Sequence, residues 1–130
     1  MAPAAKADVV ASNCAGEQAV RCGFISVDYA NNRLRGWAQI SDQTVPDIGE
    51  VQIGNVRLYR SQTDHGPWTE VAFGNYFSGW KDESDYDYTS LESCAAGWYY
   101  RVDYRWYYRD TTGYSTNQVA SSFVWHNTSC

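Results

Sequence analysis

The stretch Gly97–Arg109, GWYYRVDYRWYYR, decides the fold. Its even-numbered residues form one uninterrupted apolar and aromatic set: Trp98, Tyr100, Val102, Tyr104, Trp106 and Tyr108. Its odd-numbered residues mix arginine with tyrosine: Tyr99, Arg101, Asp103, Arg105, Tyr107 and Arg109. Successive side chains of a strand point to opposite sides of a sheet. The alternation therefore predicts a long β-strand with one buried face and one solvent-facing face, and the aromatic content favours strand over helix.

Length and composition bound the class of protein. A chain of 130 residues has the size of one domain with a real hydrophobic core. Its 11 tyrosines and 6 tryptophans carry polar tips on large apolar bodies, and such residues are common on binding surfaces. The formal net charge of −5 argues against nonspecific nucleic-acid binding, which needs a basic surface. No run approaches the roughly 18 apolar residues of a membrane span.

The N-terminal residues 1–12, MAPAAKADVVAS, are small and weakly patterned. We interpret them as an initiator methionine placed before the start of a mature secreted chain whose signal peptide is missing. An ordinary frayed cytosolic terminus is the alternative. We therefore expect a flexible N-terminal segment over 1–22 and a single domain over 23–130.

The cysteines are even in number and contain no CxxC pair and no nearby pair of histidines: Cys14, Cys22, Cys94 and Cys130. These spacings argue against a zinc site. Disulfide bonds are the favoured interpretation, and they indicate an oxidising compartment and hence secretion. Four reduced, buried thiols are the alternative.

Further alternating stretches predict the remaining strands, at 24–30, 33–41, 55–61, 68–73, 86–91 and 114–125, with a short edge pairing at 51–53. Loops are expected at 42–50, 62–67 and 74–87, and a turn at Asn31-Asn32. The apolar faces of the first two strands are Ile25, Val27 and Tyr29, and Leu34, Gly36, Ala38 and Ile40. Trp37 has the opposite parity. We favour a bulge beside Gly36 that turns Trp37 inward; the alternative is that Trp37 is exposed.

Seven strands with turn signals about every ten residues predict an all-β, two-sheet antiparallel sandwich. Residues 56–72, VRLYRSQTDHGPWTEVA, look like the third-to-fourth strand hairpin of fibronectin type III domains. Residues 88–102, YTSLESCAAGWYYRV, are similar to that family's run into its sixth strand, and residues 112–124 resemble its last turn and strand. The resemblance implies an immunoglobulin-like fold. It implies little about function, because these motifs are packing positions.

The chain departs from that family in two respects. Trp98 stands where the family has its corner tyrosine, so the buried hydroxyl-to-backbone hydrogen bond of that tyrosine is not predicted here. The loop at 42–50 and the cysteines are also foreign to the family. We therefore expect the general immunoglobulin-like sandwich rather than the exact subfamily.

The strand order of such a sandwich assigns the cysteine pairs. Cys94 precedes the sixth strand and lies at the same pole as the chain end, where Cys130 is, whereas Cys22 begins the first strand at the opposite pole. Bridged Cα atoms lie within about 7 Å, and the poles are several residues apart at roughly 3.3 Å each. We therefore predict the pairs Cys94–Cys130 and Cys14–Cys22 and no free thiol.

Motifs of the common catalytic and cofactor sites are absent, since the sequence has no GxSxG, HExxH, Walker or GxGxxG pattern. We therefore predict no catalytic residues, no cofactor and no metal. The acidic run Lys81–Asp87, KDESDYD, lacks the spacing of an EF-hand. A solvated acidic loop that faces the arginines of the long strand is favoured over a calcium site.

The outward row of the long strand is the most informative surface. With two residues of the neighbouring strand it forms a candidate partner-binding face, because Tyr and Arg are frequent anchors of protein interfaces: Arg57, Tyr59, Tyr99, Arg101, Arg105, Tyr107 and Arg109. The alternative is an ordinary solvated face in which arginine stems cover tyrosine rings. The candidates for stacking on sugar rings are Trp68, Tyr76 and Trp80, unless their loop folds inward and plugs the core.

Three functional hypotheses follow. The first is a secreted, non-enzymatic protein-binding domain, either an adaptor in an extracellular or toxin complex or an inhibitor of a foreign hydrolase, with another extracellular protein as its partner. The second is a carbohydrate-binding module that is normally attached to an enzyme. The third, a small hydrolase, has the least support because no catalytic constellation is present.

Overall fold

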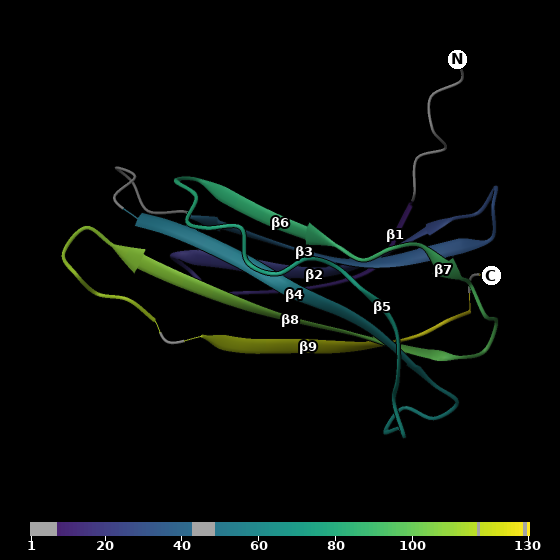
Figure 1. Ribbon diagram of the computed structural model, residues 1–130. Helices are drawn as coiled ribbons and strands as arrows, with labels where there is room; N and C mark the ends of the chain where they lie inside the picture. Colours follow the sequence, from purple (N-terminus) through teal and green to yellow (C-terminus); the bar gives the residue numbers. More distant parts are fainter. Residues whose placement is uncertain (1–7, 43–48, 117, 129) are drawn as a thin grey trace, which may run out of the picture.

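The computed structural model describes residues 8–42, 49–116, 118–128 and 130, and it is a two-layer antiparallel β-sandwich (Figure 1). Sheet A has the order β1 (Asp8–Ala15), β2 (Ala19–Asp28), β3 (Arg33–Asp42) and β6 (Ser84–Tyr88), and β7 (Glu92–Ser93) also pairs with β3. Sheet B has the order β5 (Thr69–Phe73), β4 (Gly49–Ser61), β8 (Tyr99–Asp110) and β9 (Val119–His126). The described residues contain no helix. The predicted fold class is confirmed, with nine strands in place of seven.

The long strand is confirmed as β8, and the predicted alternation holds along it. Tyr100 and Val102 are fully buried, and Tyr104, Trp106 and Tyr108 are almost fully buried. The odd-numbered residues are half-buried or exposed. The buried row packs against the inward residues of sheet A, including Ile25, Val27 and Leu34. β8 is hydrogen-bonded on both sides, to β4 and to β9, so it lies inside sheet B.

β4 differs from the two separate stretches that we expected at 51–53 and 55–61. It is one continuous strand that pairs with β8 from Gly49 to Ser61 and with β5 on its other side. The pairing with β8 is irregular between Gly54 and Arg57, and Asn55 adopts a positive φ of 54° there. The edge pairing expected at 51–53 is therefore wrong, because this stretch is the start of an interior strand. Of the loop expected at 42–50, residues 43–48 lie outside the described residues.

The N-terminal hairpin also differs from expectation. We expected residues 1–22 to be a flexible segment, but from Asp8 onwards the chain forms β1 and then β2. Cys14 and Cys22 lie directly opposite each other in this hairpin and form a disulfide. β1 is an edge strand whose residues are mostly exposed. A strand that buries so little has no strong apolar alternation for sequence reasoning to detect.

The bulge that we expected at Trp37 is absent. The register between β2 and β3 is continuous from Ala19 to Asp42, so Trp37 stays on the outer face of sheet A. Its indole stacks on Phe24 with ring centroids 3.9 Å apart, and its N–H donates to the hydroxyl of Ser26. These neighbours cover the ring without any change of register. Tyr29 also differs, because it follows the end of β2 in the turn and is 50% exposed.

The acidic run was predicted to be a solvated loop that faces the arginines of the long strand, and this prediction is wrong for two of its carboxylates. Residues 84–88 form β6, and Asp85 and Asp87 point into the sandwich with exposed fractions of 5% and 4%. Asp85 accepts a hydrogen bond from the backbone N–H of Ile53, and Asp87 accepts one from the backbone N–H of Val56. Ile53 and Val56 both belong to β4. The acidic side chains are therefore acceptors for the opposite sheet.

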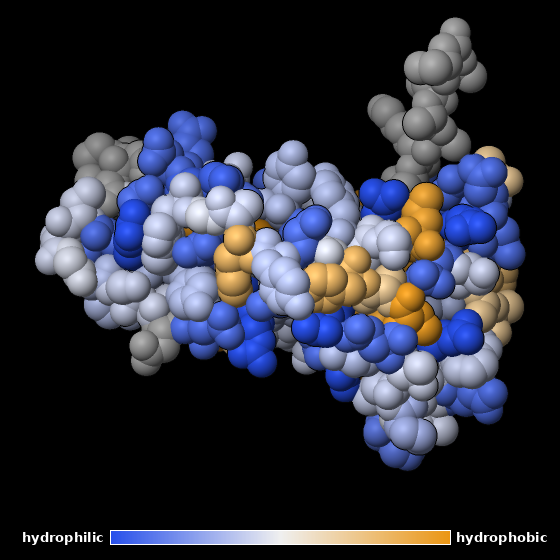
Figure 2. Space-filling model, viewed as in Figure 1, coloured by the Kyte–Doolittle hydropathy of each residue, from blue (hydrophilic) through white to orange (hydrophobic). Residues whose placement is uncertain are grey.

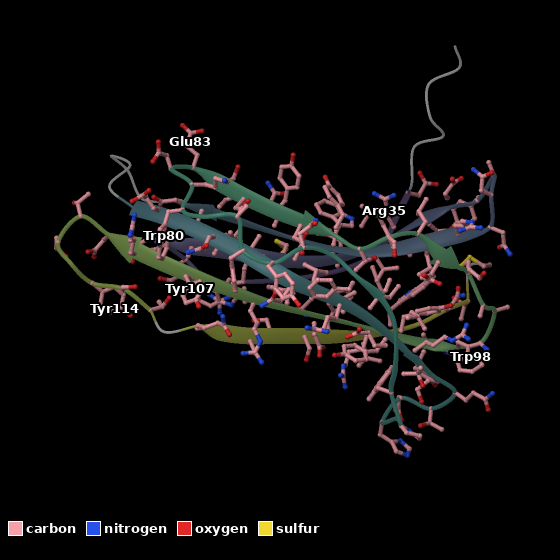
Figure 3. All side chains as sticks on the ribbon, in the orientation of Figure 1. Arg35, Trp80, Glu83, Trp98, Tyr107 and Tyr114 are labelled. Carbon is pink, nitrogen blue, oxygen red and sulfur yellow. A yellow bond between two sulfur atoms is a disulfide. The ribbon has the colours of Figure 1, made fainter. Side chains whose placement is uncertain are left out.

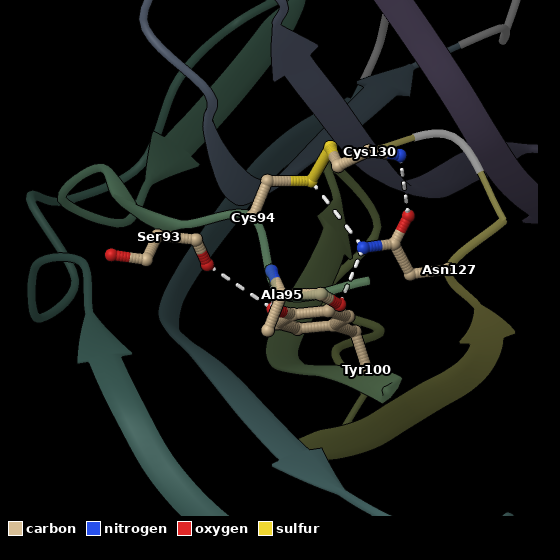
Figure 4. Close-up of a disulfide and its surroundings, with 6 residues drawn as sticks. All are labelled: Ser93, Cys94, Ala95, Tyr100, Asn127 and Cys130. Atoms are coloured by element: carbon tan, nitrogen blue, oxygen red, sulfur yellow. Dashed lines mark hydrogen bonds between the residues drawn. A yellow bond between two sulfur atoms is a disulfide. The ribbon is translucent and has the colours of Figure 1, made fainter. Parts of the chain in front are cut away.

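Both predicted disulfides are confirmed, and the cysteines among the described residues are all paired. Around Cys94–Cys130, the amide of Asn127 donates to the carbonyl of Ala95, 2.7 Å away (Figure 4). The hydroxyl of Tyr100 donates to the carbonyl of Ser93 and accepts from the N–H of Ala95. A buried hydroxyl-to-backbone hydrogen bond therefore exists at this corner. Tyr100 makes it, two residues after Trp98, although we did not predict such a bond from the sequence.

Candidate functional site

The predicted partner-binding residues are brought together on the outer face of sheet B. β4 and β8 are neighbours in register, so Tyr59 lies opposite Arg101 and Arg57 lies opposite Asp103. We call this surface the sheet B face and define it by its outward side chains: Glu50, Arg57, Tyr59, Trp68, Glu70, Phe73, Phe77, Trp80, Arg101, Asp103, Arg105, Tyr107, Arg109, Gln118, Ala120 and Ser122. Tyr99 lies at the end of the row and stacks on His126, with ring centroids 4.2 Å apart.

Aromatic rings pack on three of the four arginines of this face. The guanidinium of Arg101 lies over the rings of Tyr59 and Trp68, at 4.4 and 5.0 Å from their centroids. Arg57 lies over Phe73 at 4.6 Å, and Arg109 lies over Trp80 at 4.3 Å. Such cation–π contacts each contribute about 0.5–1 kcal/mol at exposed sites. The face therefore presents arginines that are already ordered before any partner arrives.

Two of the three proposed sugar-stacking residues, Trp68 and Trp80, belong to the same face. Trp68 packs on Arg101, and Trp80 packs on Arg109 and on the ring of Tyr107, whose centroid is 5.9 Å away. Figure 3 shows Trp80 beside Tyr107 at one end of the sandwich, with Trp98 at the other. Tyr76 is 72% exposed and touches only Phe73 among the rings of the described residues. The alternative that their loop plugs the core is therefore wrong.

The charges on the sheet B face leave one cation without a carboxylate. Three ion pairs are formed: Arg57–Glu70, Arg101–Asp103 and Arg109–Glu50. The fourth arginine, Arg105, forms no ion pair with the described residues and donates instead to Gln118, 2.7 Å away. Gln118 in turn donates to the hydroxyl of Tyr107. The face as a whole therefore carries one excess positive charge, centred on Arg105, on a chain with a formal net charge of −5.

In two of these ion pairs, one member has a raised pKa. Burial raises the pKa of the Asp103 carboxyl above its ordinary value, and the adjacent Arg101 opposes this effect. The hydrogen bond from Arg57 to Glu70 raises the pKa of the Arg57 guanidinium. Arg57 therefore keeps its charge, and the Asp103 carboxyl binds a proton more readily than an exposed aspartate does.

A hollow of about 200 Å³ lies in the middle of the face. Its lining comes from three adjacent strands: Asn55, Arg57, Tyr59, Asp103, Tyr104, Arg105, Ala120, Ser121 and Ser122. The side-chain oxygen of Asn55 is buried and has no hydrogen-bond partner. Ala120 and Ser122 on β9 are small, so the space above them beside Arg105 is open. The hollow can receive a polar side chain of a partner.

Sequence reasoning missed several members of this face. The ring of Phe73 lies under Arg57, and the ring of Phe77 contacts that of Tyr107. The positions of these two rings depend on how the segment after β5 folds over β4. Gln118 precedes β9 and carries no motif. The small outward residues Ala120 and Ser122 were readable from the alternation of the last strand. Their significance appears only once β9 is known to lie beside β8.

No candidate metal-binding arrangement forms within the described ranges. No group of three or more His, Cys, Asp or Glu residues is placed there to hold a metal ion. His65 contacts Asp64 in an exposed loop, and His126 lies on the ring of Tyr99. In the same ranges, no helix is long and apolar enough to cross a membrane.

Comparison of the chain with models of known families, with curated proteins and with solved structures finds no match. The resemblance to fibronectin type III domains therefore stays a prediction. In the view of Figure 2, apolar residues form small groups among hydrophilic ones and no large continuous apolar area.

Proposed function

We propose that the protein is a non-enzymatic protein-recognition domain whose contact surface is the sheet B face. The observation that carries the proposal is the ordering of its arginines by rings and carboxylates around a hollow with one excess cation. Arginine, tyrosine and tryptophan are the commonest anchors of protein interfaces. Side chains that are already ordered lose less conformational entropy on binding, so more of their contact energy remains as affinity.

We further propose that the domain acts outside the cell. Its two disulfides fit an oxidising environment. An adaptor in an extracellular or toxin complex and an inhibitor of a foreign hydrolase both use such a surface, and both bind another extracellular protein. The one excess cation favours a partner that offers a carboxylate at the centre of the contact.

Glycan binding is less well supported. Sugar rings stack on the flat faces of aromatic rings. One face of Trp68 is occupied by Arg101, and one face of Trp80 is occupied by Arg109. Tyr76 is the most exposed of the three glycan candidates. Its ring contacts Phe73, whereas the ring of Trp80 contacts Tyr107.

The test is capture of partners from the culture medium of the source organism on immobilised protein, followed by mass spectrometry. We expect the wild type to retain a protein that Arg105→Ala and Tyr107→Ala bind about tenfold more weakly or worse. Arg33→Ala is the matched control, because Arg33 is exposed at the start of β3 in the other sheet. Equal capture by all four proteins would refute the proposal. Loss of glycan-array signals in Trp68→Ala and Trp80→Ala alone would favour carbohydrate instead.

A further inference from the structure

β9 is an edge strand that lacks the usual protection. It ends sheet B, spans Val119–His126 and pairs with β8 without any irregularity. Its sequence, VASSFVWH, contains no proline, lysine, arginine, aspartate or glutamate. The other edge strands differ, since β1 and β5 carry pairing irregularities and β6 and β7 have five and two residues. Natural proteins guard exposed edges with charges, prolines or bulges, because a bare edge pairs with any extended chain.

The free hydrogen-bonding groups of β9 can be assigned to residues. Asn127, one residue beyond the strand, donates its backbone N–H to the carbonyl of Trp98 on the β8 side. In an antiparallel pair, successive residues direct their backbone groups alternately toward the partner strand and away from it. The N–H and C=O groups of residues 120, 122, 124 and 126 therefore point away from β8. Their side chains are the exposed ones on the sheet B face.

The two sides of this edge have different chemistry. On the inner side, Val119, Phe123 and Trp125 are apolar, half-buried and packed against the core. On the outer side, Ala120 lies opposite Arg105 in register, and Ala120 and Ser122 line the hollow. A strand beside β9 would therefore meet apolar side chains on one face and the excess positive charge on the other.

We propose that a protein partner binds by adding an extended segment to β9, with apolar side chains facing inward and acidic side chains facing Arg105. This inference rests on the proposed function and specifies how the sheet B face takes its partner. Strands lie about 4.8 Å apart, so the backbone of the added strand would lie about 10 Å from that of β8. Extended arginine and glutamate side chains together bridge that distance, and only Ala120 stands between them.

Charge decides between this partner and a second copy of the chain. If β9 paired with β9 of another copy, each would offer the other only the side chains of VASSFVWH, which include no carboxylate. Arg105 would remain without an ion pair. A segment that carries acidic residues at alternate positions satisfies both the free backbone groups and the charge, and this is a recognised mode of peptide binding.

The test uses a short synthetic peptide of alternating valine and glutamate, blocked at both ends, and its valine–lysine counterpart. We expect the glutamate peptide to bind about tenfold more tightly than the lysine peptide and to slow amide hydrogen exchange at residues 120, 122 and 124. N-methylation of alternate residues on the peptide edge that faces β9 should abolish binding. Ser122→Pro, which removes a free edge N–H and no bond to β8, should weaken binding about tenfold or more.

Ala120→Pro serves the same purpose if Ser122→Pro fails to fold. Equal affinity for the two charged peptides, or undiminished binding of the N-methylated peptide, would overturn the proposal. So would a wild-type dimer in light scattering that becomes a monomer on Ser122→Pro, because β9 would then be occupied by a second copy. If the natural partner is lost with Arg105→Ala but retained by both proline variants, strand addition fails and the proposed function stands.

Discussion

The carboxylate of Asp87 on β6 accepts a hydrogen bond from the backbone N–H of Val56 on β4, with oxygen and nitrogen 3.2 Å apart. These strands belong to different sheets, so the bond crosses the sandwich. The same carboxylate accepts from the backbone N–H and the side-chain amide of Asn75, at 2.9 and 3.0 Å. The irregular pairing of β4 leaves N–H groups that need other acceptors. Asp87 supplies one of these acceptors, and through its hydrogen bonds to Asn75 it also fixes the segment after β5.

Asp87→Ala should destabilise the protein by about 3 kcal/mol or more, because it leaves buried N–H groups without an acceptor. Chemical denaturation measures this change in the free energy of unfolding. Asp82→Ala is the matched control, since Asp82 is exposed in the preceding turn, and it should change stability by less than about 0.5 kcal/mol. Gly74→Ala should also destabilise, because its Cβ would lie 2.4 Å from the Asp87 carboxylate. Equal stability of the two aspartate variants would contradict this account.

Asp85 predicts a dependence of stability on pH. Burial raises the pKa of its carboxyl above the ordinary value of 3.8, and the hydrogen bond from the N–H of Ile53 opposes that effect. Such a carboxyl binds a proton more readily in the folded state than in the unfolded state. Its contribution to the free energy of unfolding is therefore greatest below pH 3.8 and falls as the pH rises through the folded pKa.

Asp85→Asn removes this titration and keeps an oxygen that can accept from Ile53. The difference in free energy of unfolding, wild type minus variant, should therefore decrease as the pH rises above about 3.8. Urea denaturation of both proteins across the acid range measures it. Carboxyls that do not interact with Asp85 cancel in the difference. A difference that grows with pH would show that the N–H bond outweighs burial.

The two faces of β8 predict opposite responses to substitution. Val102 is fully buried, so Val102→Asp should prevent folding, because an unpaired buried charge is very costly. Asp103→Val is on the outward row and should leave the fold intact, with a modest loss from the freed Arg101. Circular dichroism and thermal melting distinguish these outcomes. Equal damage by both changes would mean that the sheet B face is covered rather than free.

The disulfides should differ in their contribution to stability. Cys94–Cys130 closes a sequence separation of 36 residues and Cys14–Cys22 one of 8. In the chain-entropy model these loops correspond to about 4 and about 2.5 kcal/mol. Replacing both cysteines of a pair by serine should therefore cost more for Cys94–Cys130, measured by denaturation. The reverse order would place the main effect in the folded hairpin rather than in the unfolded chain.

The alternation of β8 was sufficient to predict a buried and an outward face, because a strand this long must have both. The alternation of β6, Ser84–Tyr88, also shows two faces but does not say which one is buried. Tyrosine is the better core residue by composition. The aspartates are buried instead, because β4 has N–H groups that its own sheet does not satisfy. That need arises from pairing between strands distant in sequence, which no local pattern records.

The candidate site, like the fold, was predictable where it follows from the alternation of one strand. The parity of β8 placed Arg101, Arg105 and Tyr107 on one outward row, as found. The parity could not show that Trp68 and Trp80 fold back onto that row, since loop paths are set by contacts across the sheet. We therefore treated the tryptophans as a separate surface, and the structure joins them to the arginines.

Because Trp68 belongs to the sheet B face, we expect it to contribute to protein binding. Trp68 stacks on Arg101, so Trp68→Ala should release the guanidinium and raise the entropy lost when a partner orders it again. The loss of one exposed cation–π contact corresponds to about 0.5–1 kcal/mol, or roughly two- to fivefold in Kd. Titration calorimetry with the captured partner measures the change, which should be smaller than that of Arg105→Ala.

Trp98→Ala is the matched control for Trp68→Ala. Trp98 is also half-buried and also lies under an arginine, with Arg60 at 4.7 Å from its ring centroid, but it packs against the core and is not part of the sheet B face. It should leave Kd unchanged. If both tryptophan variants weakened binding equally, the loss would come from general destabilisation. If neither did, Tyr59 and Asp103 would be sufficient to hold Arg101, and the ring of Trp68 would add nothing to recognition.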